Sequence, residues 1–192
     1  MSYYDIDAIL TDAEKVPCEF QLEVPDLGYL DNSPSHALKS GTKLSLPLWL
    51  AEMLALANTS GDDEEAKSFV NLNLPPALSN EVVQALRADP RAVPLRDQSA
   101  HFYGFATRML DLFEERDLAK ELRKTFVTRA SDVALHARKA GGAGAKEDGS
   151  NLGVSGGEEF LRGLDEWERR LFRKAHDGSK SGKEWMDSVK KH

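Results

Sequence analysis

The chain has 192 residues, of which 41% are hydrophobic and 30% are charged, and its formal net charge is −7. That composition is typical of a soluble globular protein, and the length allows one domain or two small ones. The longest apolar run falls far short of the roughly 20 residues that a membrane span needs, and the N-terminus MSYYDIDAIL lacks the basic region of a secretory signal. The single cysteine, Cys18, excludes an internal disulfide and a thiolate zinc cluster, which fits an intracellular, reducing compartment.

The charge is unevenly distributed along the chain. Residues 1–95 carry 15 acidic and 6 basic side chains, whereas residues 96–192 carry 17 acidic and 19 basic ones. A protein that binds duplex DNA by itself normally has a dense basic face, and neither half supplies one, so we do not expect direct nucleic-acid binding by the single chain. One patch supports a weaker hypothesis, the binding of single-stranded DNA: Arg169, Arg170, Arg173 and Lys174 beside Trp167 and Phe172. A solvated helix face also explains this patch.

Residues 1–75 are predicted to form a small β-rich domain with about four strands and two helices. Asp5 is placed to cap a short helix in DIDAIL. In VPCEFQLEV, residues 16–24, the apolar side chains from Cys18 onwards occupy every second position, as in a half-buried strand. Three shorter segments also have strand-like content: LGYL at 27–30, KLSL at 43–46 and FVNLNL at 69–74.

The segment GTKLSLPLWLAEMLALA, residues 41–57, predicts a strand that leads directly into a helix. Pro47 suits the first helical position, because its missing N–H would have no partner there. The helix is apolar nearly all round, with Glu52 as its only charge. Such a helix must be covered on several sides, either by its own domain or by a partner. Its candidate residues for subunit contact or inter-domain packing are Leu46, Pro47, Trp49, Leu50 and Met53.

From residue 76 the pattern changes to helical spacing, which predicts an all-helical domain over residues 76–192. The expected helices are 75–90 with prolines at both ends, 97–115, about 117–139, 158–176 and a short last helix that holds Trp185. Between them, the glycine-rich residues 140–157 are typical of a flexible loop. The fold class is therefore α+β, a small N-terminal β-rich domain followed by a C-terminal helical-bundle domain.

The motif HFYGF, residues 101–105, concentrates aromatic side chains in one helical turn. Gly104 costs about 1 kcal/mol relative to alanine inside a helix, which a close helix–helix approach can offset. The aromatic residues are either ordinary core or anchors at an inter-subunit contact, where Tyr and Trp are enriched. The candidates in this half of the chain are Phe102, Tyr103, Phe105, Met109 and Trp167.

No pattern in the sequence indicates enzyme chemistry, so we expect no catalytic residue, metal or cofactor. The histidines have no second ligand at metal spacing: His36, His101, His136, His176 and His192. The glycine-rich stretch lacks the Gly-Lys-Ser/Thr ending of a phosphate loop. Residues 153–157 of the same stretch, GVSGG, match Gly-x-Ser-x-Gly in letters, but the stretch follows a helix instead of a strand, so no nucleophile elbow is expected there. Cys18 lies on the inward face of a predicted strand, which indicates a structural thiol. A hydrolase or transferase would need clustered titratable groups.

Four segments together resemble one family. YYDIDAILTDAEKVPCEF, LGYL, GTKLSLPLWLAEML and HFYGF occur in the order and approximate spacing of the third Psf subunits of the GINS complex, in a fungal-like version. The resemblance covers most of residues 1–113. The helices after Asp117 fit in length and pattern but are not diagnostic alone, and residues 140–157 depart from the family as a lineage-specific loop would.

The resemblance implies a nuclear, non-catalytic scaffold. GINS is a heterotetramer of related subunits, each with a helical domain and a small β-rich domain, and in this subunit type the β-rich domain comes first. Its implied partners are the other three GINS subunits, the Mcm helicase ring, a RecJ-like Cdc partner and, indirectly, DNA polymerase epsilon, in the initiation and elongation of DNA replication. The rival hypothesis is a stand-alone α+β protein-interaction adaptor of another nuclear complex, which would be monomeric and well folded alone.

Overall fold

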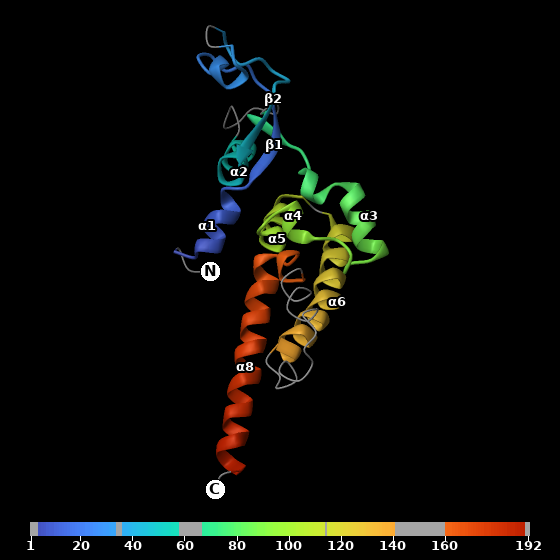
Figure 1. Cartoon of the computed structure of the whole chain (residues 1–192). Coiled ribbons are helices and arrows are strands. Elements are labelled where there is room, and N and C mark those ends of the chain that lie inside the picture. Colours follow the sequence, from blue (N-terminus) through green and yellow to red (C-terminus); the bar gives the residue numbers. More distant parts are fainter. Residues whose placement is uncertain (1–3, 34–35, 58–66, 114, 141–159, 191–192) are drawn as a thin grey trace. The chain divides into compact units, whose positions relative to one another are not determined.

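The computed structural model describes residues 4–33, 36–57, 67–113, 115–140 and 160–190. The chain divides into two compact units, Met1–Ser79 and Asn80–His192 (Figure 1). The first contains a small three-stranded sheet and the second is helical, which confirms the α+β fold class. Apart from Ala140, the predicted loop 140–157 lies outside the described residues. Among the helices that the structure describes, none combines the length and apolarity that a bilayer span requires.

The sheet of the N-terminal unit is antiparallel in the order β2-β1-β3. Strand β1 (Lys15–Phe20) lies in the middle, between β2 (Lys43–Pro47) and β3 (Val70–Leu72). In its register Cys18 lies opposite both Leu44 and Leu72, and alternate β1 side chains from Val16 to Phe20 are buried. The period-two prediction is therefore confirmed for this strand, although regular pairing ends at Phe20 and Val24 makes only an isolated bridge to Leu38.

The LGYL segment is not a strand, and this prediction is wrong. Residues Gly28–Asp31 form a 3₁₀ helix, η1, which ends where Asn32 adopts a left-handed conformation with φ 55°. The backbone packs so closely that a Cβ on Gly28 would lie 2.0 Å from the carbonyl oxygen of His36. A short apolar segment can thus pair its backbone N–H and C=O groups within a compact turn. The described sheet therefore has three strands instead of the expected four.

Two helices complete the N-terminal unit. Helix α1 (Ile6–Asp12) starts at the expected cap, because the Asp5 carboxylate accepts a hydrogen bond from the Asp7 N–H at 3.2 Å. Helix α2 (Leu48–Leu56) begins one residue later than predicted: Pro47 is the last residue of β2 and the N-cap, with an extended ψ of 142°. The Leu48 N–H donates to the Glu14 carbonyl at 2.8 Å, a bond that a proline could not make at that position.

Two of the expected helices are interrupted. The predicted helix over 75–90 is a 3₁₀ turn, η2 (Pro76–Leu78), followed by α3 (Asn80–Ala88). The predicted helix over 97–115 is α4 (Leu95–Gln98) followed by α5 (Phe102–Leu112), because Ser99 is fully extended with φ −161°.

Long helices form most of the helical unit. Helix α6 (Arg116–Ala140) confirms its prediction and packs along α8 (Glu166–Lys190), while α3 contacts α6 and α5 contacts α8 (Figure 1). The expected helix over 158–176 is broken at Asp165, where α8 starts. Since α8 runs without interruption past Trp185, the predicted short last helix is part of α8.

Candidate protein-interaction surface

Helix α2 buries one side and leaves another side uncovered. Leu48 and Ala51 are fully buried, and they fix the helix against the sheet. On another side, Trp49 is 52% exposed, Met53 is also mainly exposed and Leu56 is 70% exposed. These three recur at i, i+4 and i+7, so they form one stripe on the helix. The excess of apolar residues noted in the sequence therefore appears as uncovered surface.

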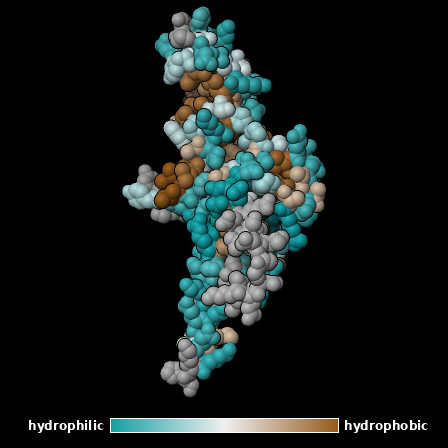
Figure 2. Space-filling model, in the orientation of Figure 1, coloured by the Kyte–Doolittle hydropathy of each residue, from teal (hydrophilic) through white to brown (hydrophobic). Residues whose placement is uncertain are grey.

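Helix α1 adds a second uncovered stripe next to α2, which it contacts. Ile6, Ile9 and Leu10 follow the i, i+3, i+4 spacing of an amphipathic helix, and all three are exposed. Figure 2 shows hydrophobic surface at the position of α1. The two stripes together are named the α1–α2 apolar face, defined by Ile6, Ile9, Leu10, Trp49, Met53 and Leu56. Exposed apolar patches of this kind mark interaction sites.

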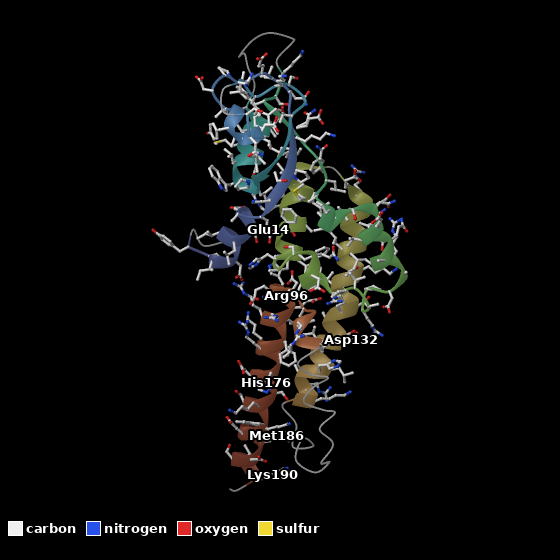
Figure 3. The ribbon with its side chains drawn as sticks, turned by 45° about the horizontal axis from the view of Figure 1, so that its top comes forward. Glu14, Arg96, Asp132, His176, Met186 and Lys190 are labelled. Atoms are coloured by element: carbon white, nitrogen blue, oxygen red, sulfur yellow. The ribbon has the colours of Figure 1, made fainter. Side chains whose placement is uncertain are left out.

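Carboxylates border the α1–α2 apolar face. Residues 4–15 and 47–57 carry one basic side chain, Lys15, and five acidic ones: Asp5, Asp7, Asp12, Glu14 and Glu52. Glu14 is visible at the end of α1 in Figure 3. An apolar surface with an acidic border is complementary to an apolar surface bordered by Lys and Arg.

The structure separates the ten candidate contact residues by exposure. Trp49 and Met53 lie on the α1–α2 apolar face, and three further candidates are half-buried: Pro47, Leu50 and Trp167. The remaining five are buried: Leu46, Phe102, Tyr103, Phe105 and Met109. Contact of any of the ten with a partner stays a prediction. Sequence reasoning missed Ile6, Ile9, Leu10 and Leu56, although the spacing within α1 carried that signal.

The HFYGF aromatics pack within the helical unit. The Tyr103 ring makes edge contacts with Phe102 and Phe126, at centroid distances of 5.6 and 5.1 Å, and stacks near Trp167 at 6.2 Å. Tyr103, Phe126 and Trp167 also line a cavity of about 230 Å³. Side chains of α5, α6 and α8 therefore surround the Tyr103 ring, as in a hydrophobic core.

A buried ion pair connects α6 to α8 beneath these aromatics. The Arg129 guanidinium donates to both carboxylate oxygens of Glu168, at 2.6 and 3.0 Å, and the Tyr103 hydroxyl donates to the same carboxylate at 3.2 Å. Arg129 also donates to the carbonyls of Pro90 and Val93 at 2.9 Å. Burial lowers the pKa of Arg129, but the hydrogen bond and charge of Glu168 outweigh it and raise the pKa above its ordinary value.

Asp165 caps two helices at once. Its carboxylate accepts the Tyr103 N–H in the first turn of α5 at 2.8 Å, and it accepts the N–H groups of Trp167 and Glu168 in the first turn of α8. Glu168 in turn accepts the Asp165 N–H at 3.3 Å, which completes a capping box. Burial raises the pKa of Asp165 to about 6, although the three N–H bonds oppose the shift. These groups bind one another, so they fix α5, α6 and α8 to one another.

The other chemical candidates have structural partners. Two members of the cationic patch bind within the chain: Arg169 donates to the Leu161 carbonyl and Arg173 to Glu166, at 3.0 Å each. Cys18 is buried, burial raises the pKa of its thiol, and the Sγ contacts the Val16 carbonyl. In the described part of the chain, no cluster of His, Cys, Asp and Glu is arranged to hold a metal ion.

Comparison with known proteins gives consistent matches along the chain. Residues 4–56 match the PSF3 N-terminal domain, and residues 77–187 match the GINS complex protein helical bundle domain. A relative from Neurospora crassa, named DNA replication complex GINS protein psf3, is 62% identical over the full length of both chains. The proteins of the same name from Gibberella zeae and Saccharomyces cerevisiae are 64% and 38% identical, over 100% and 97% of this chain and 99% and 98% of their own.

Proposed function

Because the chain belongs to the Psf3 family of GINS proteins, we propose that it is a non-catalytic scaffold subunit of a heterotetrameric GINS complex in the nucleus. In this role it assembles with the other three GINS subunits, and the complex joins the Mcm helicase ring and a RecJ-like Cdc partner in the initiation and elongation of DNA replication. Contact with DNA polymerase epsilon is indirect, and the single chain does not bind nucleic acid by itself.

The α1–α2 apolar face is the observation that carries this proposal. A seven-residue helix is too short to be stable by itself in water, yet α1 keeps Ile6, Ile9 and Leu10 exposed. Burial of a large apolar side chain contributes about 1.5–3 kcal/mol, so covering these residues and Trp49 provides a strong drive for assembly. The acidic border selects a partner surface with basic side chains, which is consistent with a specific assembly instead of general adhesion.

Co-expression with the other three GINS subunits tests the proposal. Size-exclusion chromatography with light scattering should show the wild-type chain in one particle with a single copy of each subunit. The double variant Trp49→Ser/Met53→Ser should keep its unfolding midpoint as an isolated chain and should be lost from that particle. Tyr29→Ser is the matched control, because Tyr29 is an exposed aromatic of the same unit outside the face, and it should assemble normally.

Two results would contradict the proposal. A stable wild-type monomer that ignores the other three subunits would leave the stand-alone adaptor as the better hypothesis. A loss of about 2 kcal/mol or more in the free energy of unfolding of the isolated Trp49→Ser/Met53→Ser chain would mean that the face belongs to the chain's own core.

A further inference from the structure

Helix α6 presents a cationic side to solvent. At 3.6 residues per turn, five of its basic side chains point within about 50° of one common direction, and all five are exposed. This surface is named the α6 cationic face and is defined by Arg116, Lys120, Arg123, Lys124 and Arg138. The buried side chains of α6 lie on the other side of the helix, for example Leu118, Leu122 and Val133. At a rise of 1.5 Å per residue, the face is about 33 Å long.

Two of the three carboxylates of α6 point away from this face, toward α3. Glu121 pairs there with Arg87 at 3.3 Å. Asp132, which is labelled on α6 in Figure 3, pairs with Arg91 at 2.7 Å. The two acidic side chains are only 22% and 25% exposed. Their charge is therefore paired within the helical unit, and it does not offset the cations on the outward side of α6.

The third carboxylate, Asp117, borders the face and pairs with Lys120 at 3.4 Å. Both side chains are mostly exposed, so this pair contributes little and leaves Lys120 accessible to another molecule. Within the described part of the chain, Arg123, Lys124 and Arg138 have no ion pair with a carboxylate. Positive charge is thus concentrated on this side of α6 although the whole chain has a net charge of −7, and such a concentration attracts anionic groups.

Large apolar side chains lie among these cations. Val127, which is 63% exposed, is at the centre of the face, and Leu135, which is 48% exposed, borders it. No aromatic ring joins them on the outward side of α6, whose residues 116–138 are all described: Phe126 instead packs edge-on against the Tyr103 ring at 5.1 Å. Proteins that bind single-stranded nucleic acid offer aromatic rings on which the bases stack. Cations and apolar side chains without such rings are complementary to an acidic, amphipathic protein segment.

The composition of the face indicates a reversible partner outside the four-subunit complex. Charged side chains, Lys among them, are depleted in the cores of interfaces. The α6 cationic face has five cations and only two large apolar side chains beside them, whereas the α1–α2 apolar face consists of six apolar residues. Permanent burial of the cations would require a carboxylate for each, since an unpaired buried charge is costly. A contact that stays close to solvent avoids that cost.

We propose that the α6 cationic face is a docking surface for an acidic amphipathic segment of a protein outside the four-subunit complex. The inference goes beyond the proposed function, since this partner is not a GINS subunit and the surface is not the α1–α2 apolar face. The segment places carboxylates beside Arg123 and Lys124 and again beside Arg138, about 21 Å further along the helix. Its apolar side chains cover Val127 and Leu135. Because the ion pairs stay near solvent, they act mainly on the rate and selectivity of association.

A labelled peptide of three Leu-Glu-Glu-Leu-Glu-Glu-Glu repeats is the probe, because as a helix it spans about 32 Å and carries its leucines on one side. Fluorescence anisotropy with the purified four-subunit complex should show binding that weakens as salt is added. Arg123→Glu/Lys124→Glu should bind the peptide about tenfold more weakly at low salt. The difference from wild type should shrink at high salt, because the Debye length falls from about 30 Å at 0.01 M to about 3 Å at 1 M.

Two further variants separate this effect from a general change of charge. Lys39→Glu/Lys43→Glu is the matched control: it makes the same change of charge on two exposed lysines of the N-terminal unit, and it should bind like wild type. Val127→Ala/Leu135→Ala should bind several-fold more weakly with the salt dependence of wild type. Both of its residues are exposed and alanine favours the helix, so it should be as helical as wild type by circular dichroism.

Three results would overturn the docking surface while the proposed function stands. The first is a wild-type complex that does not bind the peptide, and the second is an equal loss of binding in the two charge-reversal variants. The third is tighter binding of an oligothymidylate of similar length, lost in Arg123→Glu/Lys124→Glu, which would assign the face to nucleic acid. If the wild-type chain forms no complex with the other three subunits, the proposed function fails, and the same titration of the isolated chain then decides the docking surface.

Discussion

Replacement of Arg129 should destabilise the helical unit far more than replacement of an exposed arginine. The Arg129→Met variant removes both hydrogen bonds to Glu168, whose carboxylate is fully buried, and leaves that charge without its counter-ion. The carbonyls of Pro90 and Val93 lose their donor as well. Breaking a buried ion pair from one side costs about 3–5 kcal/mol, because the remaining charge stays desolvated. We therefore expect a loss of that size in the free energy of unfolding.

Urea unfolding followed by far-UV circular dichroism measures this loss, since most of the helix lies in the unit that contains the ion pair. Arg91→Met is the matched control: Arg91 also pairs with a carboxylate, Asp132 at 2.7 Å, but its side chain is 58% exposed. An exposed pair of this kind contributes about 0–1 kcal/mol. Both arginines pair with a carboxylate, but Arg129 is buried and also donates to two backbone carbonyls, whereas Arg91 is mainly exposed.

A second substitution separates charge from packing. In Arg129→Met/Glu168→Gln the buried carboxylate is neutral, and the amide oxygen can still accept the Tyr103 hydroxyl. The double variant should recover about 1–2 kcal/mol of the loss, because the desolvated charge is gone. A cost below about 1 kcal/mol for Arg129→Met, or a double variant less stable than the single one, would refute this account of the ion pair.

Two further predictions concern a buried carboxyl and a crowded glycine. Burial raises the pKa of Asp165 from 3.8 to about 6 in the folded chain, so its protonation favours folding below about pH 4 and that contribution is lost as the pH rises through 6. The stability deficit of Asp165→Asn, from urea unfolding at several pH values, should therefore shrink by up to about 3 kcal/mol between pH 4 and 7, and a constant deficit would contradict the raised pKa. Gly28→Ala should cost about 3 kcal/mol or more in thermal unfolding, since its Cβ would lie 2.0 Å from the His36 carbonyl oxygen. Gly41→Ala has open space around the Cβ and should cost only the strain of its φ of +84°, about 1–2 kcal/mol, so an equal cost for the two variants would argue against the close contact.

Local patterns were sufficient wherever one face of an element meets a core. Alternation in β1 predicted the burial of Cys18 and Phe20, because the side chains of a strand point to opposite faces. Helical spacing predicted α6 nearly to its ends for the same reason. The LGYL segment was too short to carry a period, and the contact of Gly28 with the backbone around His36 decided its form.

The capping role of Asp165 could not be predicted from the sequence, because the groups that it joins are far apart in the chain. The Tyr103 N–H that it accepts belongs to another helix, 62 residues earlier. The same distance explains the false prediction of one continuous helix over 97–115: α5 obtains its cap from Asp165, and the Ala100 carbonyl accepts the Glu166 N–H at 3.1 Å. At both sides of the break, hydrogen bonds to distant residues replace the intrahelical hydrogen bonds that a continuous helix would have made.

The candidate surface was predictable in kind but not in detail. The sequence shows that α2 is apolar all round, which establishes that several sides need cover but not which side its own sheet supplies. In the structure, the side that carries Leu48 and Ala51 is buried, and the side that carries Trp49 is exposed. HFYGF posed the same ambiguity: Phe102 and Tyr103 are buried within the helical unit, and their contact with a partner stays a prediction.

The charge around the α1–α2 apolar face argues against self-association through this face. Its acidic border follows the uneven charge of the chain, since the acidic residues outnumber the basic ones in residues 1–95. Apolar surfaces alone would attract any other apolar surface, including a second copy of the same face. Like charges placed opposite each other cost free energy, so an acidic border disfavours self-association through α1 and α2. The face should therefore prefer a dissimilar neighbour with basic side chains to a second copy of itself, and reversal of the border charges should redirect assembly more than their removal.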